Sequence, residues 1–294
     1  MLSILIPIYN YNAAPLVKEL RKQCMECDLE FEIICIDDCS TLHQQENQAI
    51  SGLEKCFFQI LDKNIGRSKI RNLLAAEASY KWLLFLDCDT YPAKSLFILN
   101  YVNQIKQSQF EAIYGGLQYQ NIQPKNDQML RWVYGKEREA ITVLRRQEQP
   151  YKTSLASNFL IQKSIFTTVL FNETISSYGY EDSIFIQTLQ HKNIAIDQIE
   201  NPVFHLNLET SSLFLSKTKE GIRTLFSIQQ TDFAIDSKII KTFKMLKKIK
   251  LVSFVAIVFH RAVPILEKNL VSKKPSLFVF DLYKIGYFCY LNHK

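Results

Sequence analysis

Strand and helix patterns alternate four times over about the first ninety residues, and this alternation constrains the fold more than any other feature of the chain. The apolar runs begin at Leu2, Phe31, Phe57 and Trp82. Each run has the length of one strand and few polar residues, which is typical of strands buried on both faces of a parallel sheet. We therefore expect an α/β fold, with a doubly wound, mostly parallel sheet and helices on both faces.

Two carboxylates follow the fourth run. Trp82–Leu86 leads directly into Asp87-Cys88-Asp89, and strand alternation would place both acids on one side. Ligands of open α/β sheets bind at the carboxyl ends of the strands, and carboxylate oxygens with phosphates suit Mg²⁺ or Mn²⁺. The pattern favours a metal-bound diphosphate. The alternative is that the two acids end a strand and cap the next helix.

Other polar residues stand at comparable places. Asp37-Asp38 follows the second run and suits either a helix N-cap or contact with a nucleoside. Arg67 and Arg71, at the start of the helix expected near 68–79, are placed to meet an anion or to be solvated. Gly115-Gly116 suggests a backbone that passes close to a ligand.

The later elements are less regular. We expect the following: helices at 13–24, 95–106, 126–146 and 181–189, and strands at 111–114, 155–161 and 194–199.

The composition is that of a globular protein, because 47% of the 294 residues are hydrophobic and 22% are charged. The seven cysteines have no zinc-site spacing, which suggests reduced thiols in a cytosolic protein. Since the first strand begins at Leu2, we expect no signal peptide.

Five motifs follow one another along the chain: Ser3-Ile4-Leu5-Ile6-Pro7-Ile8-Tyr9-Asn10, Ile36-Asp37-Asp38-Cys39-Ser40, Asn64-Ile65-Gly66-Arg67 with Arg71-Asn72, Phe85-Leu86-Asp87-Cys88-Asp89, and Tyr178-Gly179-Tyr180-Glu181-Asp182. In this order and spacing the chain resembles the family 2 glycosyltransferases of the GT-A fold, from residue 1 to about 210. Cys39 and Cys88 stand where other small residues are usual, and we expect neither to carry chemistry.

The resemblance implies a nucleotide-sugar donor, with a UDP-sugar favoured. Asp38 would contact the nucleotide base, helped by the backbone around Pro7 and Tyr9. Arg71 would lie near the base or the diphosphate, and Asp87 near the ribose or the metal.

The resemblance also implies a Mn²⁺ or Mg²⁺ ion and a base for an inverting transfer. Asp89 would bind the ion, and His205 resembles the additional metal ligand of many such enzymes, although it could equally be a packed or surface histidine. Asp182 would be the catalytic base, or a helix N-cap. Glu181 would hold the acceptor or donor sugar, or serve as the alternative base.

The C-terminal region differs in charge. Residues 211–294 hold 15 Lys and Arg against 5 Asp and Glu, a balance of +10, which leaves −4 of the total of +6 for residues 1–210. We expect a GT-A catalytic domain at 1–210, with a nucleotide-sugar half at about 1–115 and an acceptor half at about 116–210, and a basic helical appendage at 211–294. A basic amphipathic helix from Lys238 and the apolar run after it suit contact of residues 238–266 with an anionic membrane surface. The alternative is an appendage packed on the catalytic domain with its lysines solvated.

Together these features predict a metal-dependent, inverting glycosyltransferase that builds surface polysaccharide from a nucleotide sugar, on a glycan or lipid-linked acceptor. It would be cytoplasmic, peripheral on the cytoplasmic face of the inner membrane. A catalytically silent, membrane-associated glycan-binding or scaffold protein is one alternative. A sugar nucleotidyltransferase is another, although a Gly-rich phosphate loop would be expected where Tyr9-Asn10-Tyr11-Asn12 stands. We expect no nucleic-acid partner, because no aromatic and basic platform accompanies the charge.

Overall fold

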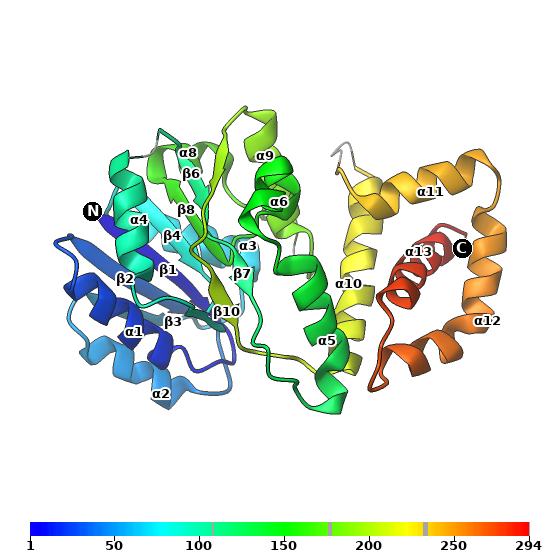
Figure 1. The fold of residues 1–294 in the computed structure, drawn as a ribbon, viewed down its shortest axis with the longest axis horizontal. Coiled ribbons are helices and arrows are strands. Elements are labelled where there is room, and N and C mark those ends of the chain that lie inside the picture. Colours follow the sequence, from blue (N-terminus) through cyan, green and yellow to red (C-terminus); the bar gives the residue numbers. More distant parts are fainter. Residues whose placement is uncertain (108, 176–177, 232–234, 294) are drawn as a thin grey trace. The chain divides into compact units, whose positions relative to one another are not determined.

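The chain is described by a computed structural model that covers residues 1–107, 109–175, 178–231 and 235–293 (Figure 1). Within this part of the chain, the larger sheet has seven strands in the order β3-β2-β1-β4-β8-β6-β9. Its strands are β1 (Leu2–Ile8), β2 (Phe31–Asp37), β3 (Cys56–Ile60), β4 (Trp82–Leu86), β6 (Ala112–Tyr114), β8 (Asn158–Gln162) and β9 (Ile196–Gln198).

Strands β1 to β4 form the parallel half of this sheet, as the apolar runs predict. β1 lies between β2 and β4, with Leu2 opposite both Phe31 and Trp82. Nearly every side chain of β1, β2 and β4 is buried, because helices cover the sheet. The other half is mixed: β8 runs antiparallel to β4 and β6, and β9 is parallel to β6. The expected α/β fold with a mostly parallel sheet is confirmed.

Several helices pack around the two sheets. α3 packs on β1 and β2, and α1 packs on α4. The helices up to residue 191, apart from those of residues 126–139 given below, are α1 (Ala14–Met25), α2 (Gln44–Gln48), the 3-10 turn η1 (Ala49–Gly52), α3 (Arg67–Glu77), α4 (Phe97–Gln107), α6 (Val143–Glu148), α7 (Pro150–Thr153), α8 (Lys163–Val169) and α9 (Glu181–His191).

A small second sheet joins three separate segments of the chain. β10 (Val203–His205) pairs antiparallel with β5 (Thr90–Pro92) and parallel with β7 (Leu117–Gln118). The Leu206 amide donates to the Asp89 carbonyl at 2.8 Å, so the end of β10 lies beside the turn that follows β4. This pairing brings His205 to the Asp87–Asp89 segment.

Gly115 and Gly116 are required by protein packing, and the expectation that their backbone passes close to a ligand stays a prediction. A Cβ on Gly115 would lie 2.4 Å from both Asn158 Nδ2 and the Tyr101 hydroxyl. Gly116 has φ +97°, and a Cβ there would meet the Arg146 guanidinium at 2.8 Å. The backbone approaches these side chains, and only glycine leaves room for them.

The prediction of a single helix at 126–146 was wrong. A 3-10 turn η2 (Asn126–Gln128), α5 (Met129–Tyr134) and a π-helical turn η3 (Gly135–Glu139) are separated by a break from α6. Arg146 of α6 turns inward and is 2% exposed. Its guanidinium donates to the Tyr114 and Ile199 carbonyls, a pairing that local sequence does not indicate.

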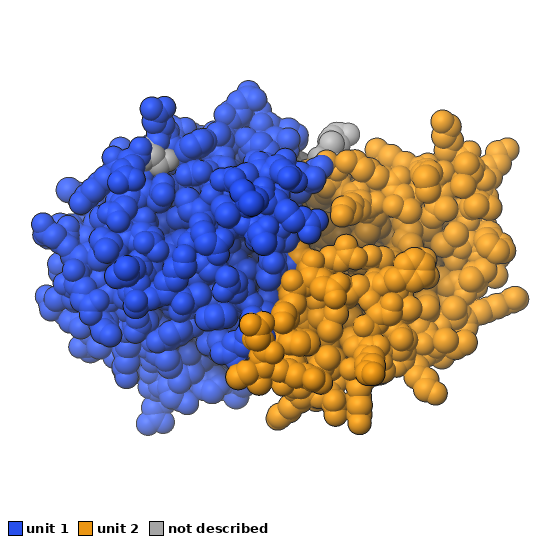
Figure 2. All heavy atoms as spheres, in the orientation of Figure 1, with its two compact units in different colours: residues 1–120, 139–176, 188–207 blue, residues 121–138, 177–187, 208–294 orange. Residues whose placement is uncertain are grey.

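The chain forms two compact units, coloured separately in Figure 2. Unit 1 comprises residues 1–120, 139–176 and 188–207 and includes both sheets, whereas unit 2 comprises residues 121–138, 177–187 and 208–294. Helix α9 begins in unit 2 and ends in unit 1. The boundary expected at residue 210, with its two halves, stays a prediction.

Unit 2 is helical. Its long helices are α10 (Ser211–Gln229), α11 (Lys238–Lys248), α12 (Val252–Leu270) and α13 (Leu277–His293). α13 contacts the other three, with Phe288 against Phe243 of α11 and Tyr283 against Phe259 of α12. In the described residues, no single helix is long and apolar enough to cross a membrane, but α11 and α12 together, bent by 119°, pass that test on length and composition.

Candidate functional site

The predicted donor residues of unit 1 lie where the parallel strands end. Ile8, the last residue of β1, is opposite Asp37, the last residue of β2. The Asp38 amide donates to the Ile8 carbonyl at 2.8 Å. β4 lies on the other side of β1 and stops at Leu86, just before Asp87. The fold therefore gathers these segments at the sheet edge where ligands of open α/β sheets bind.

Asp38 anchors the loop that leads into α3. Its carboxylate accepts hydrogen bonds from the amides of Ile65, at 2.6 Å, and Gly66, at 3.0 Å. The Asn64 side chain also donates to the Asp38 carbonyl. This buried carboxylate thus shapes the backbone ahead of Arg67. Each carboxylate oxygen can still accept a further hydrogen bond, so contact between Asp38 and a nucleotide base is possible. That contact stays a prediction.

The loops after β1 and β2 are tied together by Asn10. Its amide donates to Ser40 Oγ at 2.7 Å, and its side-chain oxygen accepts from the amides of Thr41, at 2.8 Å, and Leu42. Asn10 holds φ at 50°, which asparagine tolerates better than most residues. Nearby, Pro7 is half-buried and Tyr9 is 55% exposed. The exposed Tyr9 ring offers a flat apolar surface at this edge.

Arg71 and Asp87 form an ion pair. Arg71 Nη2 donates to Asp87 Oδ1 at 2.8 Å, and the Arg71 side chain is almost fully buried. Burial acts to raise the pKa of Asp87, but the positive charges of Arg71 and Arg67, the hydrogen bond from Arg71 and His205 together lower it. Asp87 is therefore held ionised close to two arginines at the strand end.

Asp89 lies against His205. Asp89 Oδ2 and His205 Nε2 are 3.6 Å apart, and both side chains are mostly buried. The Tyr119 ring stacks on the His205 ring at 5.4 Å between centroids, and the Tyr119 hydroxyl donates to Glu139. Burial raises the pKa of the Tyr11 phenol, and the charge of Asp89 raises it further. Asp89 thus lies beside His205, whose ring is stacked on Tyr119, and close enough to Tyr11 for its charge to act on the phenol.

The expected strand position of the two aspartates was wrong. β4 ends at Leu86, and Asp87 to Asp89 form a turn in which the Thr90 amide and hydroxyl donate to the Asp87 carbonyl. In this turn, Asp87 pairs with Arg71 and Asp89 pairs with His205. The two carboxylates therefore stand in a turn and not on one face of a strand.

This arrangement suits a divalent ion with few protein ligands. Among the described residues, no group of three or more His, Cys, Asp or Glu side chains is placed to hold a metal. Asp89 and His205 supply two donor atoms 3.6 Å apart, close enough to bind one ion at the ligand distance of about 2.1 Å. Magnesium-like ions commonly use one or two protein ligands and complete their shell with phosphate oxygens and water. The residues therefore fit an ion that binds together with a diphosphate.

Two neighbours of this site were not found from the sequence. Tyr119 lies 86 positions before His205 in the chain, and only the pairing of β7 with β10 brings their rings together. Tyr11 stands in a segment that reads simply as a turn. The one available signal was that both tyrosines stand within five residues after the end of an expected strand.

Glu181 and Asp182 belong to unit 2 and open helix α9. Gly179 and Tyr180 precede them with φ of +99° and +70°, and a Cβ on Gly179 would meet the Gly221 backbone at 3.0 Å. The Tyr178 carbonyl accepts from the Thr224 hydroxyl at 2.9 Å. A tight turn anchored on α10 therefore places both acids in the first turn of α9, where the helix dipole stabilises negative charge.

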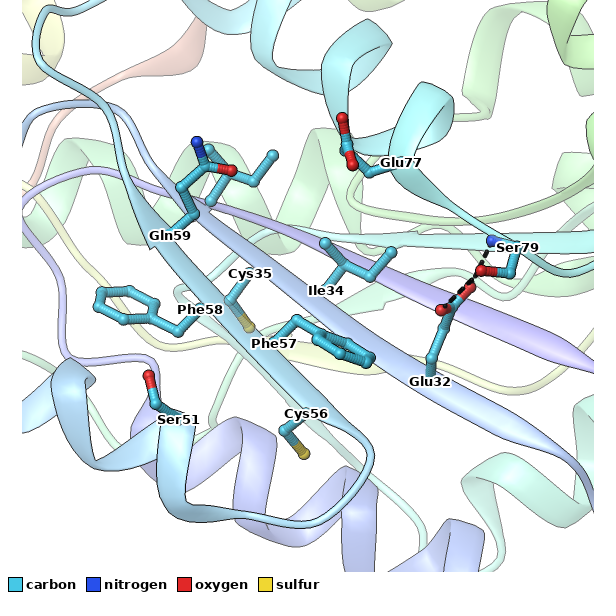
Figure 3. A pocket seen from close by; sticks show the side chains of 11 residues that line it. Glu32, Ile34, Cys35, Ser51, Cys56, Phe57, Phe58, Gln59, Glu77 and Ser79 are labelled. Atoms are coloured by element: carbon cyan, nitrogen blue, oxygen red, sulfur yellow. Dashed lines mark hydrogen bonds between the residues drawn. The ribbon is translucent and has the colours of Figure 1, made fainter.

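A hollow of about 490 Å³ lies elsewhere, around edge strand β3. Figure 3 shows its lining side chains, with Glu32 hydrogen-bonded to Ser79. None of the predicted site residues lines it. Glu32 and Ser79 stand near the amino-terminal ends of β2 and β4, so this hollow is separate from the Asp87–Asp89 edge.

Comparisons with known proteins bear on the family and the fold of the chain. The model of the family described as Glycosyl transferase family 2 matches residues 3–170. A comparison with curated protein sequences finds no match.

Several solved structures share the fold. The mannosyltransferase PcManGT from Pyrobaculum calidifontis, in complex with GDP-Man and Mn²⁺, is 13% identical, with a TM-score of 0.54 over 79% of this chain and 65% of that one. Glucosyl-3-phosphoglycerate synthase from Mycobacterium tuberculosis, in complex with Mn²⁺, UDP and glucosyl-3-phosphoglycerate, is 17% identical, with a TM-score of 0.51 over 77% of this chain and 79% of that one.

S. aureus TarS 1-349 is 17% identical, with a TM-score of 0.50 over 100% of this chain and 92% of that one. The present chain spans only 40% of the length of another S. aureus TarS structure. At these identities the likeness concerns the fold, which is GT-A-like with the added helices α10–α13.

Proposed function

The chain belongs to glycosyl transferase family 2, and from this membership we propose that it is an inverting, metal-dependent enzyme that uses a UDP-sugar. It is a glycosyltransferase that moves a sugar from a nucleotide sugar. The acceptor in this proposal is a hydroxyl of a glycan or of a lipid-linked precursor of surface polysaccharide. The proposed place of action is the cytoplasmic face of the inner membrane.

The observation that carries the proposal is the pairing of Asp89 with His205 beside the Arg71–Asp87 ion pair. Two metal donors and two arginines at the end of a parallel sheet match the needs of a nucleoside diphosphate, which carries its negative charge on phosphates. Mn²⁺ is present with the nucleotide in two of the similar structures, PcManGT and the Mycobacterium synthase. The choice of UDP over GDP is part of the proposal, because those two structures hold different nucleotides.

The residues at the strand ends divide the binding of the donor among them. Asp38 and the backbone around Pro7 and Tyr9 hold the base. Arg67 and Arg71 face the diphosphate. Asp87, held ionised by Arg71, orients the Arg71 guanidinium and also contacts the ribose. Asp89 and His205 would hold the Mn²⁺ or Mg²⁺ ion, which when bound stabilises the charge of the departing diphosphate.

Asp182 supplies the base in this mechanism. Inverting transfer needs one group to take the proton of the acceptor hydroxyl while the anomeric carbon gains positive charge and the diphosphate leaves from the opposite face. The first turn of α9 favours an ionised carboxylate at Asp182. Glu181, which is 5% exposed, holds a sugar hydroxyl in this account. No covalent intermediate is needed.

A donor assay tests this proposal without knowledge of the acceptor. Release of nucleoside diphosphate is measured with a panel of UDP- and GDP-sugars, in Mn²⁺ and in EDTA. We expect release from one UDP-sugar, lost in EDTA, and at least about a hundredfold slower in Asp182→Asn, because a general base contributes about that much.

Glu181→Gln is the comparison that separates the two acids. It should weaken donor use while leaving a measurable rate. An unchanged rate in Asp182→Asn would contradict the assignment of the base, and release from GDP-sugars alone would contradict the choice of UDP.

A further inference from the structure

Helix α12 of unit 2 is apolar on two opposite sides. One side, with Ala256, Phe259 and Leu270, is buried, and Phe259 packs against Tyr283 and Tyr287 of α13. Figure 1 shows α12 beside α13. An apolar side of a helix is normally covered by another part of the protein or by a partner. The second side of α12 therefore needs an explanation.

That second side is exposed and continuous. Phe254, Ile257, Val258, Arg261 and Ile265 recur at helical spacing and so share one face, which we call the α12 face. Phe254 is 63% exposed and Ile265 is 74% exposed. Large apolar side chains gathered on one exposed face mark an interaction surface, whereas scattered ones are ordinary.

The segment that leads into α12 is strongly basic. Residues 238–266 contain six lysines and one arginine and no acidic residue. Lys244, Lys247, Lys248 and Lys250 are exposed and form what we call the basic turn. Within the described residues, no ion pair is recorded for any of these four lysines, whereas Lys241 pairs with Asp236. The basic turn also carries exposed Met245 and Ile249.

Charge decides between the possible occupants of this surface. A second copy of the chain would place the same basic turn opposite itself in a two-fold interface, and like charges would oppose it. A nucleic acid would leave the apolar α12 face in water. An anionic lipid surface satisfies both features, because phosphate headgroups attract the lysines and the acyl boundary takes up the apolar side chains.

We infer that the α12 face and the basic turn dock the protein on an anionic phospholipid bilayer, with α12 lying in the plane of the interface. The side of α12 that packs on α13 stays with the protein, and Arg261 reaches the headgroups from the α12 face. This inference rests on the proposed function only for its purpose, which is to bring the enzyme to a lipid-linked acceptor.

Vesicle binding of the full chain tests the inference directly. Flotation is measured with vesicles of phosphatidylcholine alone and of phosphatidylcholine with phosphatidylglycerol, at low and high salt. We expect binding to the anionic vesicles that weakens as salt rises. Phe254→Ser/Ile265→Ser and Lys247→Glu/Lys248→Glu should each reduce binding at least about tenfold. These side chains are exposed, so the variants should stay folded.

Matched substitutions elsewhere control for general changes in hydrophobicity and charge. Ile122→Ser/Leu144→Ser removes equally exposed apolar side chains, and Lys18→Glu/Lys81→Glu reverses exposed lysines of unit 1. Both should bind as the wild type does. Asp89→Ala should also bind normally, which separates failure of docking from failure of the donor site.

Three results would overturn the inference. The first is equal flotation of the wild type and both α12 variants, or no flotation at all. The second is a dimer that dissociates in Phe254→Ser/Ile265→Ser, which would assign the surface to self-association. The third is resistance of the bound protein to alkaline carbonate extraction, which would indicate that the bent pair of α11 and α12 spans the bilayer.

Discussion

At the scale of single residues, the Arg71–Asp87 ion pair gives the site a defined response to acid. The pKa of Asp87 is lowered from its ordinary value of 3.8, so the folded protein binds a proton at this carboxyl less readily than the unfolded chain does. The stabilisation of the folded protein by this ion pair is therefore complete above the pKa of Asp87 in the unfolded chain. It is lost as the pH falls through the lower pKa of Asp87 in the folded protein.

The expected result is a pH-dependent difference between wild type and Asp87→Asn. The free energy of unfolding from urea titration should favour the wild type at about pH 6, and the advantage should shrink toward about pH 3. In an Arg71→Met background the same comparison should show little change with pH, because the main attracting charge is gone. A difference that stays constant from pH 6 to pH 3 would contradict the ion-pair account.

Tyr119 is the second residue with a specific expected effect. Its ring stacks on His205, and its hydroxyl donates to Glu139, so it fixes the imidazole that faces Asp89. Groups that orient metal ligands typically change metal affinity by about 10- to 100-fold when removed. Tyr119→Leu should weaken Mn²⁺ binding about tenfold, measured by electron paramagnetic resonance titration with UDP present.

Tyr119→Phe keeps the stacked ring and loses only the hydrogen bond to Glu139. It should therefore lie between the wild type and Tyr119→Leu. Wild-type Mn²⁺ affinity in a folded Tyr119→Leu protein would show that the stacking does not position His205.

At the scale of elements, the site depends on the junction of β6, β8 and β10. Asn158 at the start of β8 donates to the carbonyls of Gly116 and Asn201, and Asn201 precedes β10 and His205. Gly115 packs directly on this asparagine, so the junction leaves no space for a side chain there. The position of His205 thus rests on contacts between segments far apart in sequence.

Gly115→Ala should destabilise the whole fold. The new Cβ would stand 2.4 Å from Asn158 Nδ2 and 2.5 Å from the Asn201 carbonyl oxygen, which is backbone and cannot rotate away. Overpacking of this kind costs about 1–3 kcal/mol, which a urea titration would resolve. Gly52→Ala is the matched control, because nothing lies within 4 Å of its added Cβ. Equal stability of the two variants would contradict the packing argument.

At the scale of the whole molecule, the fold could be predicted because its strands are marked locally. β1, β2 and β4 are short, mostly apolar runs ended by turn residues, and such runs admit few other structures. Arg146 and Tyr119 could not be predicted in this way. Arg146 is buried among carbonyls that come from other strands, and Tyr119 meets His205 only through the pairing of β7 with β10.

The candidate site was also predicted only in part from the sequence. Asp38, Asp87 and Asp89 stand at strand ends, which the sequence marks clearly, and they lie at one edge of the sheet. The partners of Asp87 and Asp89 depend on where β4 stops and on the turn that follows, whereas strand alternation had predicted that both acids lie on one side of a strand. Turn geometry depends on tertiary contacts, such as the Leu206 amide bound to the Asp89 carbonyl, that single-sequence patterns do not contain.

The central claim is that Asp89 and His205 hold a divalent ion that binds with a nucleoside diphosphate. Thermal unfolding of wild type, Asp89→Ala and the exposed control Asp28→Ala, each with UDP and with or without Mn²⁺, tests it most directly. A ligand at a hundred times its Kd adds about 2.7 kcal/mol, which raises the melting temperature visibly. We expect a Mn²⁺-dependent rise with UDP in wild type and Asp28→Ala that is lost in Asp89→Ala. No rise in any folded protein would contradict the claim and favour a catalytically silent binding protein. An equal rise in Asp89→Ala would contradict the assignment of Asp89 as a metal ligand.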